Sequence, residues 1–185
     1  MAEALADQIM RKLKQADESY HRLMLVVAPA GAGKTTALQD VKERVDVSLI
    51  NVNMDLSRRM LDLTDRQRAL QLPRLLREIL NDAEGEVVLF DNIEILFDVS
   101  LKQDPLRLLQ GLSRNKTVVA AWNGKIISDV RKRKVMSGGQ QSFDSSLVPH
   151  PSPLYLIYAV PDHPEYRRYR VRDFLVASPK FSAED

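Results

Sequence analysis

Four residues, Gly31, Gly33, Lys34 and Thr35, have the types and spacing that can hold nucleotide phosphates. They follow an apolar run, Leu23 to Val27, and precede a helix-compatible segment. Glycines let backbone N–H groups turn toward a phosphate, and the helix N-terminus adds further donors. Lys34 would reach the β- and γ-phosphates, and the Thr35 hydroxyl would ligate the Mg²⁺ that bridges them. The segment therefore predicts a site for ATP and Mg²⁺.

The predicted loop departs by one residue from the pattern G-x-x-x-x-G-K-[ST], because Ala28 stands where the first glycine is expected. A glycine-rich turn followed by a chance Lys-Thr pair is the alternative interpretation. The apolar strand before the loop and a second motif downstream favour the phosphate site. The predicted ATP-binding residues are Pro29, Ala30, Gly31, Ala32, Gly33, Lys34, Thr35 and Thr36.

The second motif is an apolar strand, Val87 to Phe90, that ends in Asp91. The carboxyl ends of parallel strands meet at one edge of a sheet, so Asp91 would emerge beside the loop that carries Lys34. A carboxylate at that place can hold Mg²⁺, usually through water. An acid at the end of an apolar strand is common by itself, but the upstream loop makes Asp91 a predicted metal ligand together with Thr35.

Three residues are candidates for a catalytic role: Lys34, Glu94 and Asn123. Many ATPases place a glutamate directly after the metal-binding acid to polarise the attacking water, but this chain has Asn92, which cannot accept a proton. Glu94 could approach the γ-phosphate as the general base, or it could be a solvated cap of the next helix. Asn123 could orient water or contact the γ-phosphate, or it could be a turn residue before Gly124.

Composition restricts the remaining functions. The 185 residues suit a single domain over 1–185, and the net charge of +2 is too small to indicate nucleic-acid binding by itself. Cysteine is absent, and the three histidines are too scattered for a metal cluster. No apolar run approaches the roughly 20 residues that span a bilayer, so we expect no membrane partner and a cytoplasmic protein.

Hydrophobic periodicity predicts strands and helices that alternate along the chain. An amphipathic helix is expected within 1–20. The predicted strands are 23–28, 47–52, 86–91, 117–122 and 154–160, followed by an extended segment at 169–176. Further helices are predicted at 35–44 and 105–112, the second with Asp104 as its N-cap.

Two segments of the chain interrupt this alternation. Leu56 to Leu80 predicts two helices in sequence, because Pro73 should break or restart a helix there. The region 125–153 combines a basic run, Gly138-Gly139 and three prolines, which predicts a flexible loop region. That loop would lead from the fourth predicted strand to the fifth.

The order of these parts resembles the AAA+ and related STAND families of P-loop ATPases, through the loop at 31–35, the acidic strand end at Asp91 and the polar strand end at Asn123. The resemblance covers about Leu23 to Val160. It implies an α/β P-loop NTPase core, with a mainly parallel five-stranded sheet flanked by helices and Asn123 in the role called sensor 1. Only a short tail follows the fifth predicted strand, which leaves no room for the helical lid domain of AAA+ proteins. The missing lid and the absence of a glutamate directly after Asp91 both depart from the family, and they fit a slow ATPase or a nucleotide-dependent switch.

The chain also resembles the BrxF family, the small P-loop proteins of type III BREX phage-defence systems, in its length, its loop, its Asp91-Asn92-Ile93-Glu94 box and its missing lid. This resemblance implies a cytoplasmic ATP-binding component that acts with other proteins of a bacterial defence operon, which include a DNA methyltransferase and a large ATPase. We also expect nucleotide-dependent self-association. A non-hydrolysing adaptor or DNA-binding assembly protein with a vestigial loop is the alternative. A GTPase is disfavoured, because no Asn-Lys-x-Asp box that reads guanine is present.

Two basic segments could contact other molecules. Arg131, Lys132, Arg133 and Lys134 form a run that could meet DNA phosphates or a neighbouring subunit's γ-phosphate, and Arg131 and Arg133 are the candidates for the second role. A solvated helix end is the alternative. The segment Tyr166 to Arg172 interleaves aromatic residues and arginines, which suits either single-stranded nucleic acid or an edge strand guarded by charge.

Overall fold

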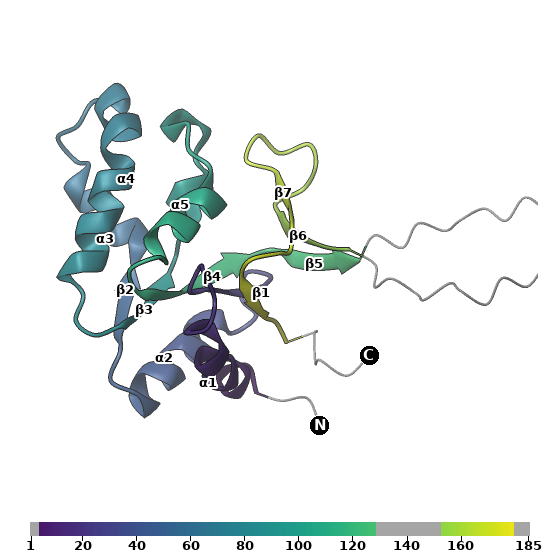
Figure 1. Ribbon diagram of the computed structural model, residues 1–185. Coiled ribbons are helices and arrows are strands. Elements are labelled where there is room, and N and C mark those ends of the chain that lie inside the picture. The colour runs from purple at the N-terminus through teal and green to yellow at the C-terminus, as the bar shows by residue number, and fades with distance from the viewer. Residues whose placement is uncertain (1–3, 129–152, 180–185) are drawn as a thin grey trace, which may run out of the picture.

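The computed structural model describes residues 4–128 and 153–179 of the chain (Figure 1). Its centre is a five-stranded sheet made of β1 (Leu23–Ala28), β2 (Ser48–Asn51), β3 (Val87–Asp91), β4 (Thr117–Asn123) and β8 (Leu175–Ala177). The strand order is β2-β3-β4-β1-β8, and every neighbouring pair is parallel. The prediction of a mainly parallel five-stranded sheet is confirmed.

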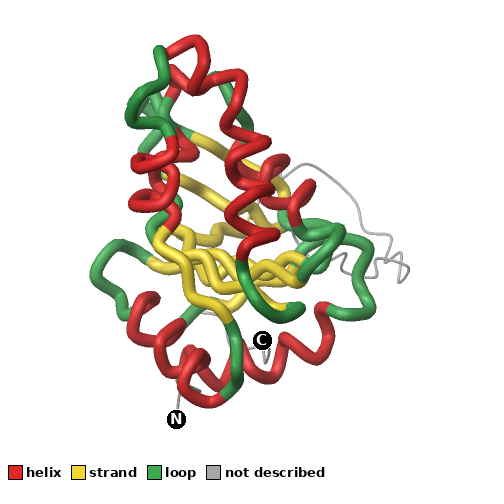
Figure 2. Tube along the Cα trace, turned by 90° about the vertical axis from the view of Figure 1, so that its left-hand side faces the viewer, coloured by secondary structure: helices red, strands yellow, loops and turns green. Residues whose placement is uncertain are grey.

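Helices cover both faces of this sheet and give the fold three layers, as Figure 1 and Figure 2 show. One face carries α1 (Leu5–Ala16) and α2 (Lys34–Arg44). The other face carries α3 (Val52–Arg59), α4 (Asp65–Asp82) and α5 (Pro105–Leu112). Two short 3₁₀ helices, η1 (Glu94–Phe97) and η2 (Val99–Leu101), follow β3.

Alternate residues of β1 point into two separate cores. Leu23, Leu25 and Val27 pack with the α3, α4 and α5 side, whereas Met24 and Val26 pack with α1 and α2. All five side chains are fully buried. A strand covered on both faces needs an apolar residue at every position, which explains why β1 is a continuous apolar run.

The fifth strand of the parallel sheet is not the one that was predicted. The segment 154–160 contributes β6 (Leu154–Tyr158) to a separate antiparallel sheet, between β5 (Lys125–Ser128) and β7 (Arg167–Arg170). The place beside β1 is taken by β8, which comes last in the chain. Periodicity indicates that a segment is a strand, but pairing partners far apart in sequence decide which sheet it joins.

Two further predictions in this part of the chain are wrong. The segment 169–176 is not one extended piece, because Asp173 has a left-handed backbone (φ 60°) that turns the chain between β7 and β8. The region 125–153 does not begin as a loop, because 125–128 form β5 and pair with β6. Residues 129–152 of that region lie outside the described part of the chain.

Pro73 does not break a helix, which corrects another prediction. The division between α3 and α4 lies earlier, where Thr64 and Gln67 form a capping box at the start of α4. Pro73 lies inside α4 and lacks the N–H that would bond the carbonyl of Ala69. The side-chain amide of Gln103 donates to that carbonyl at 2.9 Å, so a residue from a distant loop supplies the missing hydrogen bond.

The ends of the other helices follow the sequence more closely. Asp104 caps α5 by accepting a hydrogen bond from the N–H of Arg107 at 2.9 Å, as predicted, and Pro105 occupies the first helical position. In α1, Ala6 and Ile9 are buried against the sheet. None of the helices within 4–128 and 153–179 has the length and apolar character needed to cross a membrane.

Candidate nucleotide-phosphate site

The loop between β1 and α2 has the backbone that the glycine spacing predicts. Gly31 (φ 76°) and Gly33 (φ 84°) both adopt the left-handed conformation, which costs other residues more than glycine. Gly33 is the N-cap of α2, so that helix begins at Lys34. The first turn of α2 therefore presents its unpaired N–H groups at the end of the loop.

This loop forms one wall of a pocket of about 360 Å³ at the carboxyl ends of β1, β3 and β4. The pocket brings together most of the predicted site residues, namely Ala30, Gly31, Gly33, Lys34, Thr35, Thr36, Asp91, Glu94 and Asn123. Pro29 lines the neighbouring cavity instead. The N–H of Ala32 turns back within the loop and donates to the carbonyl of Pro29 at 3.3 Å.

Lys34 is the buried cation of the pocket, with 8% of its surface exposed. Its ammonium donates to the carbonyl oxygens of Ala28 (2.9 Å) and Pro29 (2.7 Å). Burial lowers the pKa of Lys34, and the carboxylates of Glu94 and Asp91 partly offset that effect. Two carbonyls use two of the three ammonium protons, which leaves one for a ligand.

Asp91 ends β3 and is 6% exposed. One of its carboxylate oxygens accepts a hydrogen bond from the N–H of Asn92 at 3.0 Å, which leaves the other oxygen available. The Thr35 hydroxyl lies in the same pocket. A carboxylate and a hydroxyl are oxygen ligands of the kind that Mg²⁺ prefers, and Mg²⁺ completes its shell with water and substrate phosphates. The donor set therefore fits Mg²⁺.

Glu94 lies in the pocket with both carboxylate oxygens occupied by side-chain amides. One oxygen accepts a hydrogen bond from Asn123, and the other accepts one from Asn53 at 3.4 Å. The side chain of Asn53 also accepts the N–H of Ile95 at 2.9 Å, which fixes it against η1. Glu94 is thus held in place by residues from two other elements.

Asn123 is the last residue of β4, not part of a turn. Its backbone is paired with Ala28 of β1, directly before the phosphate loop. Parallel pairing of β1, β3 and β4 brings the ends of these three strands to one edge, which places Asn123 beside Glu94. The predicted residues at the three strand ends therefore meet in one pocket.

Asn53 is the site residue that the sequence did not single out. It lies at the start of α3, two residues after the end of β2. The same rule that pointed to Asp91 and Asn123 applies here, because β2 is parallel to β3 and its carboxyl end lies at the same edge. A polar residue after the second strand was the signal that could have identified it.

A second cavity, of about 450 Å³, adjoins the pocket through Asn123, which lines both. Tyr158 lies in its wall, and burial raises the pKa of this tyrosine to about 12, helped by the nearby carboxylates of Glu165 and Glu94. Tyr158 therefore keeps its hydroxyl proton at neutral pH. The predicted basic residues at 131–134 lie outside the described part of the chain.

Comparisons with known proteins add little to this geometry. No protein-family model matches the sequence, and no curated protein matches it either. Among solved structures, the chain is similar to the structure of C. elegans PCH-2, with 17% identity and a TM-score of 0.34, over 70% of this chain and 36% of that chain. A similarity at this level carries no argument about function.

Proposed function

We propose that this chain binds ATP·Mg²⁺ as a P-loop NTPase core of the AAA+ type. The observation that carries the proposal is the pocket itself. It gathers a glycine loop at a helix N-terminus, a buried lysine, a buried aspartate at a strand end and a glutamate held by two amides. These are the parts that phosphoryl-transfer sites use to bind phosphates, hold the metal ion and orient water.

Each group has its own role in the proposed site. The N–H groups of the loop and of the first turn of α2 bind phosphate oxygens, and Lys34 neutralises their charge. Thr35 and Asp91 would hold Mg²⁺, which would supply positive charge against the phosphate oxygens. Glu94 orients the attacking water and accepts its proton, with Asn123 beside it.

Slow turnover is the form of catalysis that this arrangement supports. Each oxygen of Glu94 already accepts one amide hydrogen bond, so an attacking water molecule must share the carboxylate with Asn53 and Asn123 and use a remaining lone pair. The neighbouring position holds Asn92, which cannot act as a base. We therefore propose a slow ATPase or a nucleotide-dependent switch.

The biological setting remains a proposal based on resemblance. We propose that the chain is a BrxF-family component of a BREX phage-defence system in the cytoplasm, where it self-associates in response to nucleotide and acts with other proteins of the system. Contact with DNA through Arg131, Lys132, Arg133 and Lys134 belongs to the same proposal.

Calorimetric titration with ATP·Mg²⁺ tests nucleotide binding. Lys34→Ala should weaken binding by roughly 100-fold, because a charge-assisted contact contributes about 1.5–3 kcal/mol. Lys42→Ala removes the same charge from an exposed position of the same helix and should leave the affinity unchanged. Equal affinity of wild type and Lys34→Ala would contradict the proposal.

The alternative is an adaptor that does not hydrolyse nucleotide. The observation in its favour is that the Lys34 ammonium is already bonded to two carbonyls of its own loop. Under this alternative, Lys34→Ala would assemble with its partners as the wild type does, and added ATP·Mg²⁺ would change neither the mass in solution nor that assembly.

A further inference from the structure

The β5–β6–β7 sheet has one side turned away from the protein core. Cross-strand partners in an antiparallel sheet lie on the same face, and the register pairs two rows of residues across the three strands. Together these rows form what we call the outer face, whose residues are Lys125, Ile127, Tyr155, Ile157, Arg168 and Arg170. Ile157 is buried, and Ile127 and Tyr155 are half-buried.

The opposite side of this sheet faces the core. Leu156 is fully buried, and the ring of Tyr169 packs edge-on against Trp122 with centroids 6.0 Å apart. The indole N–H of Trp122 donates to the carbonyl of Ile157 at 3.2 Å, which fixes β6 to β4. The position of the sheet is therefore set by its inner side.

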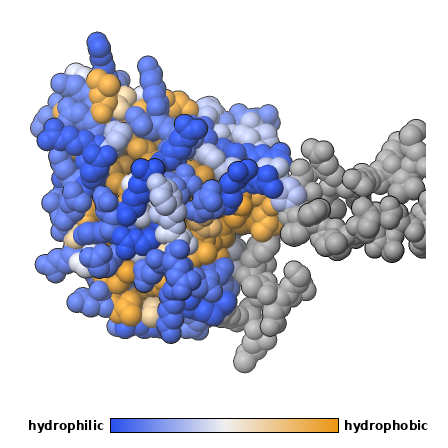
Figure 3. Space-filling model, in the orientation of Figure 1, coloured by the Kyte–Doolittle hydropathy of each residue, from blue (hydrophilic) through white to orange (hydrophobic). Residues whose placement is uncertain are grey.

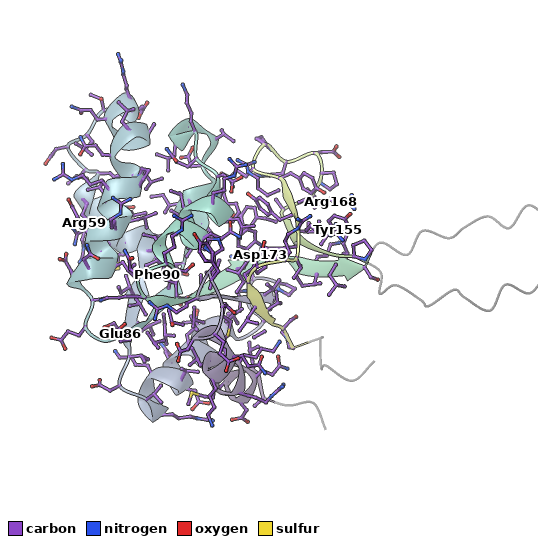
Figure 4. All side chains as sticks on the ribbon, viewed as in Figure 1. Arg59, Glu86, Phe90, Tyr155, Arg168 and Asp173 are labelled. Atoms are coloured by element: carbon purple, nitrogen blue, oxygen red, sulfur yellow. The ribbon has the colours of Figure 1, made fainter. Side chains whose placement is uncertain are left out.

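The outer face combines exposed cations with an aromatic ring. Lys125, Arg168 and Arg170 are all exposed. The guanidinium of Arg168 lies over the ring of Tyr155, 4.1 Å from its centroid, and Figure 4 shows the two side chains together. Figure 3 shows hydrophilic and hydrophobic residues side by side where β5 and β6 extend from the core.

We propose that the outer face binds single-stranded nucleic acid. Phosphodiesters would pair with Lys125, Arg168 and Arg170, one cation from β5 and two from β7. Bases stack on guanidinium planes, and the guanidinium of Arg168, which lies over the ring of Tyr155, offers such a plane to a base. Among the described residues, this face presents strands and no helix that could enter a groove of duplex DNA. This favours a single strand over a duplex as the ligand.

The cavity beside Pro29 extends the outer face toward the phosphate pocket. Ile157 and Lys125 belong to both the face and the cavity. The carboxylate of Glu165 also lines the cavity and repels phosphates, so we place the backbone of the strand over the arginines and a base in the cavity. His163, also in this wall, accepts the N–H of Glu165 through Nδ1 at 3.1 Å and thus has Nε2–H for a base.

This inference does not depend on ATP binding, so the test is made without nucleotide. Fluorescence anisotropy of the full chain would follow a labelled oligothymidylate of about 20 nucleotides between low and moderate salt. The double variant Arg168→Ala/Arg170→Ala should bind at least tenfold more weakly, with a salt slope reduced by about 1.4. Arg168→Lys keeps the charge and loses the planar guanidinium, so it should weaken binding about fivefold at an unchanged slope.

Matched control variants distinguish binding at the outer face from nonspecific attraction of nucleic acid to any basic residue of the protein. Arg66→Ala/Arg77→Ala removes two exposed arginines from α4 and should change affinity by less than twofold. A variant with Arg131, Lys132, Arg133 and Lys134 all replaced by serine should still lose affinity when Arg168 and Arg170 are removed. Binding of an oligouridylate, measured in the same way, compares RNA with DNA. Tighter binding of either one agrees with the proposal, because both are single-stranded.

Three results would overturn the proposal. They are an oligothymidylate that does not bind at low salt, an equal loss of affinity in the α4 double variant, and a duplex of the same length that binds more tightly than the single strand. Thermal unfolding of each variant would show that the folded state is kept, since both arginines are exposed.

Discussion

The phosphate pocket and the β5–β6–β7 sheet both depend on the end of β4, yet they are built differently. In the pocket, Lys34 donates to two carbonyls five and six residues earlier, and Asp91 accepts the N–H of the next residue. In the β5–β6–β7 sheet, Trp122 donates to a carbonyl 35 residues later, and the hydroxyl of Tyr169 bonds to Asp104 across 65 residues. The charges also differ, because Lys34 and Asp91 of the pocket are buried, whereas the cations of the outer face are exposed.

This difference sets how each region can recognise a ligand. Lys34 and Asp91 are held by neighbouring residues before any ligand arrives, so a ligand must match a fixed geometry and single substitutions should have large effects. The cations of the outer face are hydrated, so binding there should depend on their number and on salt. Substitutions that affect one region and not the other test this comparison.

The largest effect is expected for Glu94→Gln. Glutamine keeps the size of the side chain but cannot accept a proton, so phosphate release should fall by about 100-fold or more, whereas ATP·Mg²⁺ affinity should change little. Glu86→Gln is the control, because Glu86 is exposed and lies directly before β3, at the end of that strand away from the pocket. Unchanged phosphate release in Glu94→Gln would remove this residue from the catalytic role and leave only its contacts with Asn53 and Asn123.

Gly124→Ala should disturb the β5–β6–β7 sheet and spare the pocket. A Cβ at this position would lie 1.9 Å from the carbonyl oxygen of Ile157, so the backbone of β5 or β6 must move. We expect a loss of about 1–3 kcal/mol in the free energy of unfolding, with weaker oligothymidylate binding. Gly111→Ala is the matched control, since nothing lies within 4 Å of its added Cβ and alanine favours a helix.

ATP·Mg²⁺ affinity is the second measurement on Gly124→Ala. The N–H of Gly124 donates to the carbonyl of Ala28 at 3.1 Å, and that carbonyl also accepts from Lys34. The second carbonyl bonded to Lys34, that of Pro29, and the contact of Asp91 with Asn92 do not involve Gly124, so the affinity should stay within about threefold of the wild type. A large loss of nucleotide affinity would mean that β4 couples the two regions more tightly than their separate contacts indicate.

The same difference explains how much of the molecule the sequence predicted. The strands 23–28 and 87–91, the glycine loop and the Asp104 cap depend on residues close in sequence, and the structure has them where they were expected. Asp91 and Asn123 could be placed in one pocket because parallel strands end at the same edge. Local patterns were sufficient wherever the partners are close or the topology is regular.

The sequence failed where a distant partner decides the outcome. Segment 154–160 has the pattern of a strand, but its pairing with β5 rather than with β1 is set by contacts such as that of Trp122 with Ile157. For Asn53 the strand-end rule indicates the pocket edge, but its contact with Glu94, 41 residues later, shows only in the structure. Pro73 predicts a helix break because it has no N–H, but the amide that compensates for it comes from Gln103, 34 residues from the carbonyl that it reaches.

Gln103→Ala measures the smallest of these long-range contributions. Without the Gln103 amide, the carbonyl of Ala69 loses its donor, because Pro73 has no N–H to offer. The free energy of unfolding should fall by about 1 kcal/mol, which corresponds to a decrease of roughly 2–4 °C in Tm for a chain of this size. Gln39→Ala, at an exposed position of α2, should change Tm by less than half of that.

A double-variant cycle shows whether this loss comes from the unpaired carbonyl. Pro73→Ala restores an N–H to bond the carbonyl of Ala69 within α4, so Gln103→Ala should cost less in that background than in the wild type. Equal costs in both backgrounds would mean that Gln103 stabilises the protein through other contacts. A smaller loss of stability from Gln103→Ala in the Pro73→Ala background would show that a side chain from another part of the chain supplies the hydrogen bond missing from α4. The sequence of α4 alone predicts a break at that place.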